Sequence, residues 1–149
     1  MTSALPDATE IVHGLWIGRR PALDPFATFD VVVSLTEEPP EHHPPVGKVG
    51  LHFPMKDNGR VQDPETIRAV VRSVIELLES GRAVLVHCSL GLSRSALFAA
   101  LVLVERGEAP RDAVDHIRRV RRGSFGAVEA GLWGKSGRRY ASWILERRT

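Results

Sequence analysis

Two apolar segments joined by a short loop constrain the fold of this chain more than any other feature. Residues 83–87 (AVLVH) are a continuous apolar run with the length and composition of a strand that is buried on both faces. After a short polar stretch, residues 95–106 form a helical pattern that is apolar on nearly every side, which predicts a central helix. A strand and a helix that are both buried require a layered structure in which the strand lies inside a sheet.

Other segments have the pattern of short strands. Residues 11–18 are typical of two strands around a glycine turn, residues 29–35 (FDVVVSL) of a buried strand, and residues 51–53 of a shorter one. Residues 37–48 include four prolines, which exclude regular structure and predict a surface loop. The chain therefore offers several strands to one sheet.

Helices alternate with these strands. Asp63 and Pro64 are typical of the N-cap and first residue of a helix, its apolar residues recur every three or four positions, and Gly81 ends it. Another helix is expected over residues 110–121, and a last one over residues 138–147 with an inner side formed by Tyr140, Trp143 and Ile144. This alternation predicts an α/β fold with a central, largely parallel twisted sheet flanked by helices.

The length and the cysteine content limit the class of protein. A chain of 149 residues is expected to form one domain, residues 1–149, and its single cysteine excludes an internal disulfide and a cysteine-rich zinc site. The first ten residues lack the features of a secretory signal, and the longest apolar run, residues 96–104, is far shorter than the ~18 residues that span a bilayer. We therefore expect a cytoplasmic protein with a reduced thiol and no membrane partner. Arginines crowd the last third of the chain, which favours anionic partners, although a solvated helix face has the same composition.

The loop between the two apolar segments carries the chemistry. Residues 87–95 (HCSLGLSRS) join the carboxyl end of a buried strand to the first turn of a buried helix, and α/β proteins bind anions at such places. Gly91 permits the positive φ that a tight curl needs, and the Arg94 guanidinium is a two-pronged donor for phosphate oxygens. Inorganic phosphate or sulfate, or a phosphoryl group, would fit inside a curl of the backbone N–H groups of Ser89, Leu90, Gly91, Leu92, Ser93 and Arg94.

The same loop acts on Cys88. Amide dipoles, the helix N-terminus and the neighbouring guanidinium favour the thiolate, and such sites bring the pKa of a thiol into the range of about 3.5–7.5. A thiolate beneath a bound phosphoryl group is a nucleophile for displacement at phosphorus. Ser95 is placed to hydrogen-bond the sulfur and help it depart. The alternative is that Cys88 is only a small residue of the core, as most lone buried cysteines are.

This segment resembles the signature HCxxGxxR[ST] of the cysteine-dependent protein phosphatases. Residues 12–18 are similar to the opening motif of the small, atypical dual-specificity phosphatases, and residues 54–57 (PMKD) are similar to their P-x-x-D loop. Residues 121–129 are similar to the segment that follows the signature helix, without its proline. The resemblance implies that residues 1–149 form a single catalytic domain with a protein tyrosine phosphatase-like fold.

The resemblance also implies a role for each residue of the site. Cys88 would attack phosphorus while Asp57, as general acid, protonates the departing oxygen. Asp57 would then act as a base that activates water, a proton transfer worth about 10²–10⁴ in rate. Arg94 would bind the phosphoryl oxygens, and Ser95 would assist departure of the sulfur. His87 would have a supporting role, in which it holds the loop and tunes the thiolate.

Two alternatives concern the general acid. Asp57 precedes Asn58 and Gly59, a natural turn sequence, so it could serve only to form a turn. Asp63 is the second candidate for the acid, although it is also expected to cap a helix.

The expected function is a phosphatase of phosphotyrosine, and of phosphoserine or phosphothreonine, on proteins or peptides, with no cofactor and no metal. Leu90 and Leu92 are apolar where phosphoinositide phosphatases carry lysine and RNA 5′-triphosphatases a basic or polar residue, which disfavours lipids and nucleic acid. The arginine-rich last third of the chain is nevertheless compatible with a lipid or a nucleic-acid substrate. Two alternatives of other classes are a phosphate-binding pseudophosphatase module and a rhodanese-type sulfurtransferase, whose loops are usually shorter between cysteine and arginine.

Overall fold

A five-stranded sheet with its last strand in the middle organises the molecule. The computed structural model describes residues 7–126 and 134–146. The strands are β1 (Ala8–Val12), β2 (Leu15–Gly18), β3 (Val31–Ser34), β4 (Val49–His52) and β5 (Val84–His87), and their order across the sheet is β1-β2-β5-β3-β4. β5 is parallel to β2 and to β3, β3 is parallel to β4, and only the β1–β2 hairpin is antiparallel.

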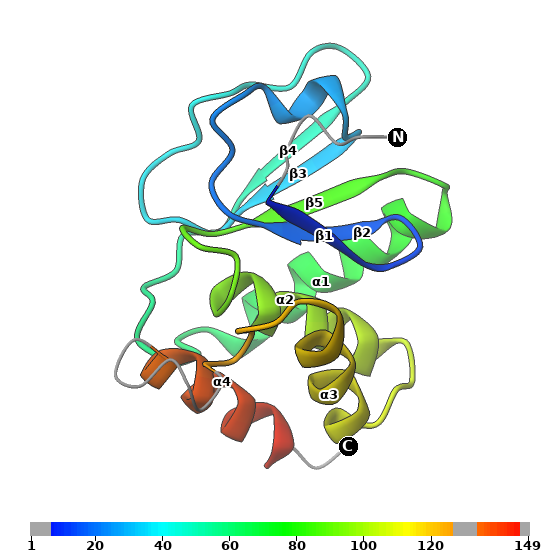
Figure 1. Ribbon diagram of the computed structural model, residues 1–149. Coiled ribbons are helices and arrows are strands. Elements are labelled where there is room, and N and C mark those ends of the chain that lie inside the picture. The colour runs from blue at the N-terminus through cyan, green and yellow to red at the C-terminus, as the bar shows by residue number, and fades with distance from the viewer. Residues whose placement is uncertain (1–6, 127–133, 147–149) are drawn as a thin grey trace.

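Four helices gather on one side of this sheet (Figure 1): α1 (Pro64–Glu79), α2 (Arg94–Glu105), α3 (Pro110–Val120) and α4 (Lys135–Leu145). α2 lies in the middle of this layer, in contact with the other three helices and with β2 and β5, and its residues 94–103 are all buried. The opposite face of the sheet has a smaller apolar cluster under the short helix η1 (Pro25–Ala27), formed by Phe26, Phe29, Val32 and Leu85. In the part of the chain that the structure describes, no helix is both long and apolar enough to cross a membrane.

The expected fold is confirmed. The expected strands and helices are all present, and residues 37–48 contain no helix or strand. Asp63 accepts a hydrogen bond from the Thr66 backbone N–H as N-cap of α1, and Gly81 follows that helix with φ of +87°. Some boundaries differ: β1 begins at Ala8 rather than at residue 11, β4 begins at Val49 rather than at residue 51, and α4 begins at Lys135 rather than at residue 138. Gly137 allows this early start, since a Cβ there would lie 2.6 Å from the backbone nitrogen of Gly126.

The register of the strands determines where the loop after β5 emerges. Gly18 of β2 and Ser34 of β3 are both paired with His87, the last residue of β5. The carboxyl ends of three parallel strands thus meet at one edge of the sheet, which is where α/β proteins bind their ligands. The loop formed by residues 88–93 begins at this edge and leads into α2.

Candidate active site

Cys88 lies at the base of this loop, one residue past β5. Its side chain is only 2% exposed, and the backbone N–H of Gly91 donates a hydrogen bond of 3.2 Å to its Sγ. The Ser95 hydroxyl lies 3.3 Å from the same sulfur, a hydrogen bond in which either atom could be the donor. An amide N–H directed at sulfur stabilises the thiolate relative to the thiol, because it donates better to the charged form.

The curl of the loop depends on a close contact between two glycines. Gly91 adopts a φ of +73°, the conformation that glycine accepts at no steric cost. A Cβ on Gly91 would also lie 2.4 Å from the carbonyl carbon of Gly18, at the end of β2. The loop is tied to the same strand end by a hydrogen bond from the Arg20 N–H to the Ser89 carbonyl (3.1 Å). Its backbone is therefore held against the sheet edge.

Arg94, the first residue of α2, is almost fully buried, with 5% of its surface exposed. Its Nη1 donates to the carbonyl oxygens of Met55 (2.9 Å) and Leu35 (3.4 Å), and its Nη2 donates to the Ser89 hydroxyl (3.0 Å). Its Nε is buried and has no hydrogen-bond partner in the described structure. A buried donor without an acceptor is costly, and an anion in the loop is the kind of ligand that would satisfy it.

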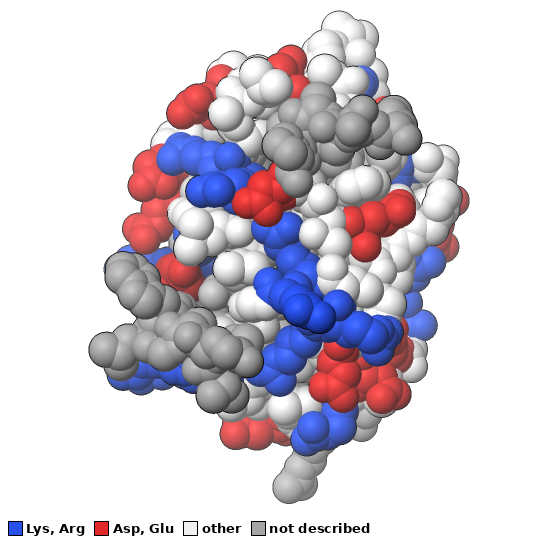
Figure 2. All heavy atoms as spheres, viewed as in Figure 1, with Lys and Arg blue, Asp and Glu red and all other residues white. Residues whose placement is uncertain are grey.

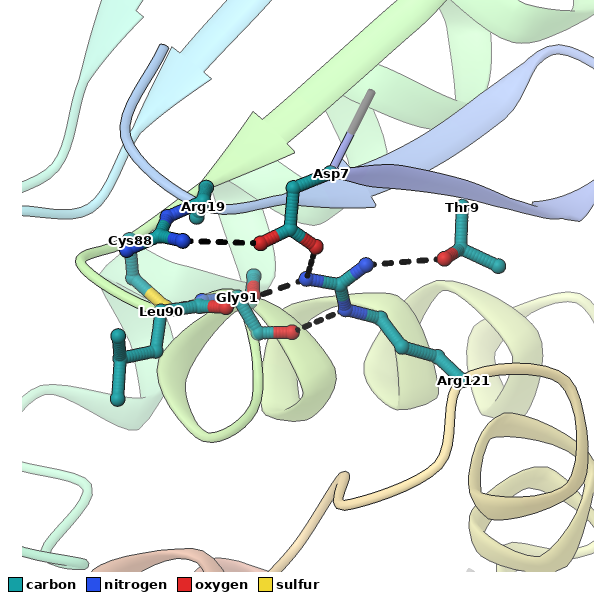
Figure 3. Close-up of polar contacts among 8 residues, drawn as sticks. Asp7, Thr9, Arg19, Cys88, Leu90, Gly91 and Arg121 are labelled. Carbon is teal, nitrogen blue, oxygen red and sulfur yellow. Dashed lines mark hydrogen bonds and ion pairs between the residues drawn. The ribbon is translucent and has the colours of Figure 1, made fainter. Parts of the chain in front are cut away.

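Arg121 holds the outer side of the loop, a contact that sequence reasoning missed (Figure 3). Its Nε donates to the carbonyl oxygen of Gly91 (2.8 Å), and its Nη2 donates to that of Leu90 (3.1 Å). On its other side, Nη1 donates to the Thr9 hydroxyl (2.9 Å) and Nη2 pairs with the Asp7 carboxylate (3.0 Å). One guanidinium thus connects the loop to the start of the N-terminal strand.

Nothing in the local sequence distinguishes Arg121 from its basic neighbours. Figure 2 shows Lys and Arg side chains in a band across the middle of the face viewed in Figure 1. Arg119 and Arg122 are exposed, whereas Arg121 is buried because the backbone leaves the helical conformation at this C-cap of α3. Residues 127–129, the rest of the segment that resembles the family after the signature helix, lie outside the described residues, as do Trp133 and residues 147–149.

His87 lies behind the loop, as expected. Its Nε2 is 2.8 Å from the Ser34 hydroxyl in a buried hydrogen bond, and its Nδ1 is buried without a partner among the described residues. The pKa of His87 is lowered to about 4, chiefly by burial, with a smaller opposing effect of the Cys88 backbone and further lowering effects of the nearby Arg20 and Arg94 charges included in that value. The imidazole is therefore neutral at neutral pH, in a structural position rather than that of a cation beside the sulfur.

Asp57 is exposed, on the loop that follows β4. This loop is held against the site at two points: the Met55 carbonyl accepts from Arg94, and the Lys56 carbonyl accepts from the Tyr140 hydroxyl (2.9 Å). Burial raises the pKa of Tyr140, and the charge of Asp57 raises it as well. The backbone directly before Asp57 is thus fixed to Arg94 on one side and to α4 on the other.

Asp63 has another set of partners. Its carboxylate accepts hydrogen bonds from the Thr66 backbone N–H (3.2 Å) and the Thr66 hydroxyl (2.8 Å). Both contacts belong to the N-cap of α1.

The remaining side chains of the loop carry no charge. Ser89 and Leu90 are exposed, Leu90 by 57%, while Leu92 and Ser93 are half-buried. The Leu92 carbonyl accepts from the Phe125 N–H (2.8 Å), so the segment after α3 also supports the loop. Across the described ranges, no three His, Cys, Asp or Glu side chains gather as metal ligands would.

The fold and this loop define a class of protein, an α/β domain with a cysteine at the base of a tight loop between a buried strand and a buried helix. Residues 20–132 match the family model described as "Dual specificity phosphatase, catalytic domain", and the chain belongs to this family. The expected membership of the cysteine-dependent phosphatases is therefore confirmed.

Individual phosphatases of known sequence or structure are also similar to this chain. The chain is 36% identical over 94 residues to protein tyrosine phosphatase type IVA 2 of Mus musculus, a match that covers 57% of this chain and 53% of that protein. The chain spans about half the length of the curated relatives it matches. Among solved structures, Tk-PTP in the active form is similar with a TM-score of 0.71 and 28% identity, over 96% of this chain and 99% of that one. A mouse putative dual specificity phosphatase complexed with zinc tungstate has the same fold, with a TM-score of 0.72 and 22% identity over 98% and 96% of the two chains.

Proposed function

We propose that this protein hydrolyses phosphomonoesters, with phosphotyrosine in proteins or peptides as the principal substrate and phosphoserine and phosphothreonine as further ones. The observation that carries this proposal is the arrangement around Cys88, whose buried sulfur accepts the Gly91 N–H at the base of the loop, beside the fixed guanidinium of Arg94. The exposed apolar side chain of Leu90 beside the loop fits a peptide better than a polyanionic substrate.

The reaction has two steps. In the first, the Cys88 thiolate attacks phosphorus, the bond to the leaving oxygen breaks, and Asp57 donates its proton to that oxygen. The phosphoryl group is then bonded to sulfur, and its oxygens lie among the loop N–H groups and Arg94. In the second step, Asp57 takes a proton from water, the water oxygen attacks phosphorus, and the thiolate departs with the S–P bonding electrons. Inorganic phosphate leaves, and neither step requires an oxidant, a metal or a cofactor.

Two further residues act on the sulfur. The Ser95 hydroxyl, 3.3 Å from Sγ, donates to the thiolate as it departs and so makes it a better leaving group. His87, neutral and bonded to Ser34, supports the loop from the sheet side. We assign Asp57 rather than Asp63 as the general acid, because the Asp63 carboxylate is occupied by the N-cap of α1.

The proposal includes the organisation of the chain. We infer that residues 1–149 act as one catalytic domain, since the described helices and sheet share one large apolar core. We further infer a cytoplasmic location, where a single catalytic thiol stays reduced.

The test is hydrolysis of an aryl phosphate by the purified protein in the presence of EDTA. The wild type should release phosphate, and Cys88→Ser should release none, because a hydroxyl at this position is not ionised at neutral pH. Full activity of Cys88→Ser would refute the mechanism. Binding of a phosphotyrosine peptide by the wild type without turnover would instead identify a phosphate-binding module.

A further inference from the structure

A groove lies between the loop that follows Asp57 and the outer face of α4. Its volume is about 540 Å³. Residues 58–61 line one wall and α4 the other, with Arg60, Lys135, Arg138 and Arg139 as the basic residues and Glu146 as the acidic one. Val61 and Trp143 add apolar surface. The groove is therefore basic with an apolar component.

Both walls are firmly connected to the rest of the molecule. α4 packs against α2 with a buried side that consists of Gly137, Tyr140, Ala141 and Ile144. The loop lies directly on α4, since a Cβ on Gly59 would be 2.4 Å from the Cβ of Arg139, whose Nη1 also donates to the Asn58 carbonyl (3.4 Å). The groove is thus a fixed feature, and it starts one residue from Asp57.

The length of the groove suits a peptide. The lining residues on this wall run from Lys135, the first residue of α4, to its C-cap Glu146, a distance of roughly 16 Å at a rise of about 1.5 Å per residue. An extended chain advances about 3.3 Å per residue, so roughly five peptide residues match this length. Among the described residues, neither Arg60 nor Lys135 forms an ion pair with a carboxylate of the protein. Their charges are available to an acidic ligand.

We infer that this groove binds acidic residues that flank the phosphorylated residue of a protein substrate. The inference rests on the proposed function, because the phosphoryl group in the loop of residues 88–93 brings the neighbouring peptide past Asp57 and onto residues 58–61. Carboxylates of the peptide then pair with Arg60 and Lys135, and its main chain lies along α4. Complementary charge at the rim of an interface acts on the encounter rate and on specificity.

The test compares three phosphotyrosine peptides. The first has three glutamates before the phosphotyrosine, the second has three glutamates after it, and the third has glutamines in place of the glutamates. One of the glutamate peptides should have a kcat/KM on the order of tenfold above the glutamine peptide at low salt, and the advantage should shrink as salt is added. Arg60→Glu/Lys135→Glu should remove the advantage and leave hydrolysis of a small aryl phosphate unchanged. The matched control is Arg106→Glu/Arg111→Glu, which changes the net charge equally at exposed positions beyond the far end of α2.

The outcomes separate this inference from the proposed function. If the wild type hydrolyses the aryl phosphate and has the same kcat/KM for all three peptides, the groove does not bind acidic residues of the substrate. The inference is then wrong, while the phosphatase assignment holds. The same conclusion follows if the control variant loses the preference as fully as the groove variant. A wild type that binds phosphoinositide vesicles through Arg60 and Lys135, with no peptide preference, would also overturn the inference. Failure to hydrolyse any aryl phosphate would remove the proposed function itself.

Discussion

The guanidinium of Arg121 offers the sharpest test of how the loop is held in shape. Its N–H groups donate to the Leu90 and Gly91 carbonyls on one side and to Thr9 and Asp7 on the other. Arg121→Lys keeps the charge but replaces a planar fork with one compact ammonium, which cannot reach both sides of the network. Of the two loop contacts that this variant would lose, the one at the Gly91 carbonyl is buried and the one at the Leu90 carbonyl is part-buried.

The expected magnitude follows from these contacts. A buried polar group left without a partner costs about 1–3 kcal/mol, so the loss of the donor to the Gly91 carbonyl predicts a fall of about 1–3 kcal/mol in the free energy of unfolding, with a smaller addition from the part-buried contact at Leu90. The pair with Asp7 adds little, about 0–1 kcal/mol, because the Asp7 side chain is 47% exposed. Urea denaturation measures this loss. Arg119→Lys is the matched control, since exposed Arg119 has, within residues 7–126 and 134–146, only the His116 ring nitrogen as a hydrogen-bond partner, at 3.3 Å.

A second readout separates positioning of the loop from plain stability. With its outer carbonyls released, the loop directs its N–H groups less firmly at Cys88 and at a bound anion, so alkylation of Cys88 by iodoacetamide at neutral pH should slow. Inhibition by inorganic phosphate should weaken about tenfold, the equivalent of about 1.4 kcal/mol. If Arg121→Lys is destabilised but keeps the alkylation rate and phosphate affinity of Arg119→Lys, Arg121 supports the fold alone. If stability is unchanged as well, the reasoning about the network is refuted.

Three other predictions concern single residues. Asp57→Asn should lower kcat about 10²–10⁴-fold on an ester with a poor leaving group and much less on an activated aryl phosphate. Asp63→Asn retains a good N-cap and should leave both rates intact. Equal losses of activity in the two variants would exclude Asp57 as the general acid. Because His87 takes up a proton at about 4 in the folded protein and at 6.5 in the unfolded chain, stability should fall by up to about 3 kcal/mol as pH drops through this interval. His87→Asn should flatten that part of the urea-denaturation profile, and an identical slope in both proteins would refute the assignment. Peroxide should inactivate the enzyme through Cys88 without forming an internal disulfide, since no second cysteine exists, and mass spectrometry of the oxidised peptide would reveal any exception.

The fold could be predicted because its signals are local. Apolar residues at a spacing of three or four mark α1, a continuous apolar run marks β5, and an all-apolar helix can only be central. The candidate site was predictable for the same reason, since residues 87–95 are contiguous and their order alone determines which strand end and which helix end they join.

The support of the site could not be predicted, because it comes from distant parts of the chain. Asp7 and Arg121 are separated by 114 positions in the sequence. Residues 118–122 include four arginines, and their local sequence does not indicate which of them is buried in the fold. The start of α4 was misplaced for a related reason. Glycine in a helix costs about 1 kcal/mol by local propensity, yet Gly137 is favoured there because it lets two backbone segments pack closely.

The contact between Gly91 and Gly18 limits how the specificity of this protein can evolve. Neither position tolerates even a methyl group without moving backbone, since a Cβ on Gly18 would in turn lie 2.9 Å from the Asp7 carbonyl oxygen. Substitutions that change the substrate are therefore not tolerated at these two glycines, whereas they are tolerated at the exposed side chains of the loop, chiefly Leu90. Libraries that aim to redirect the chemistry should diversify that position and hold both glycines constant.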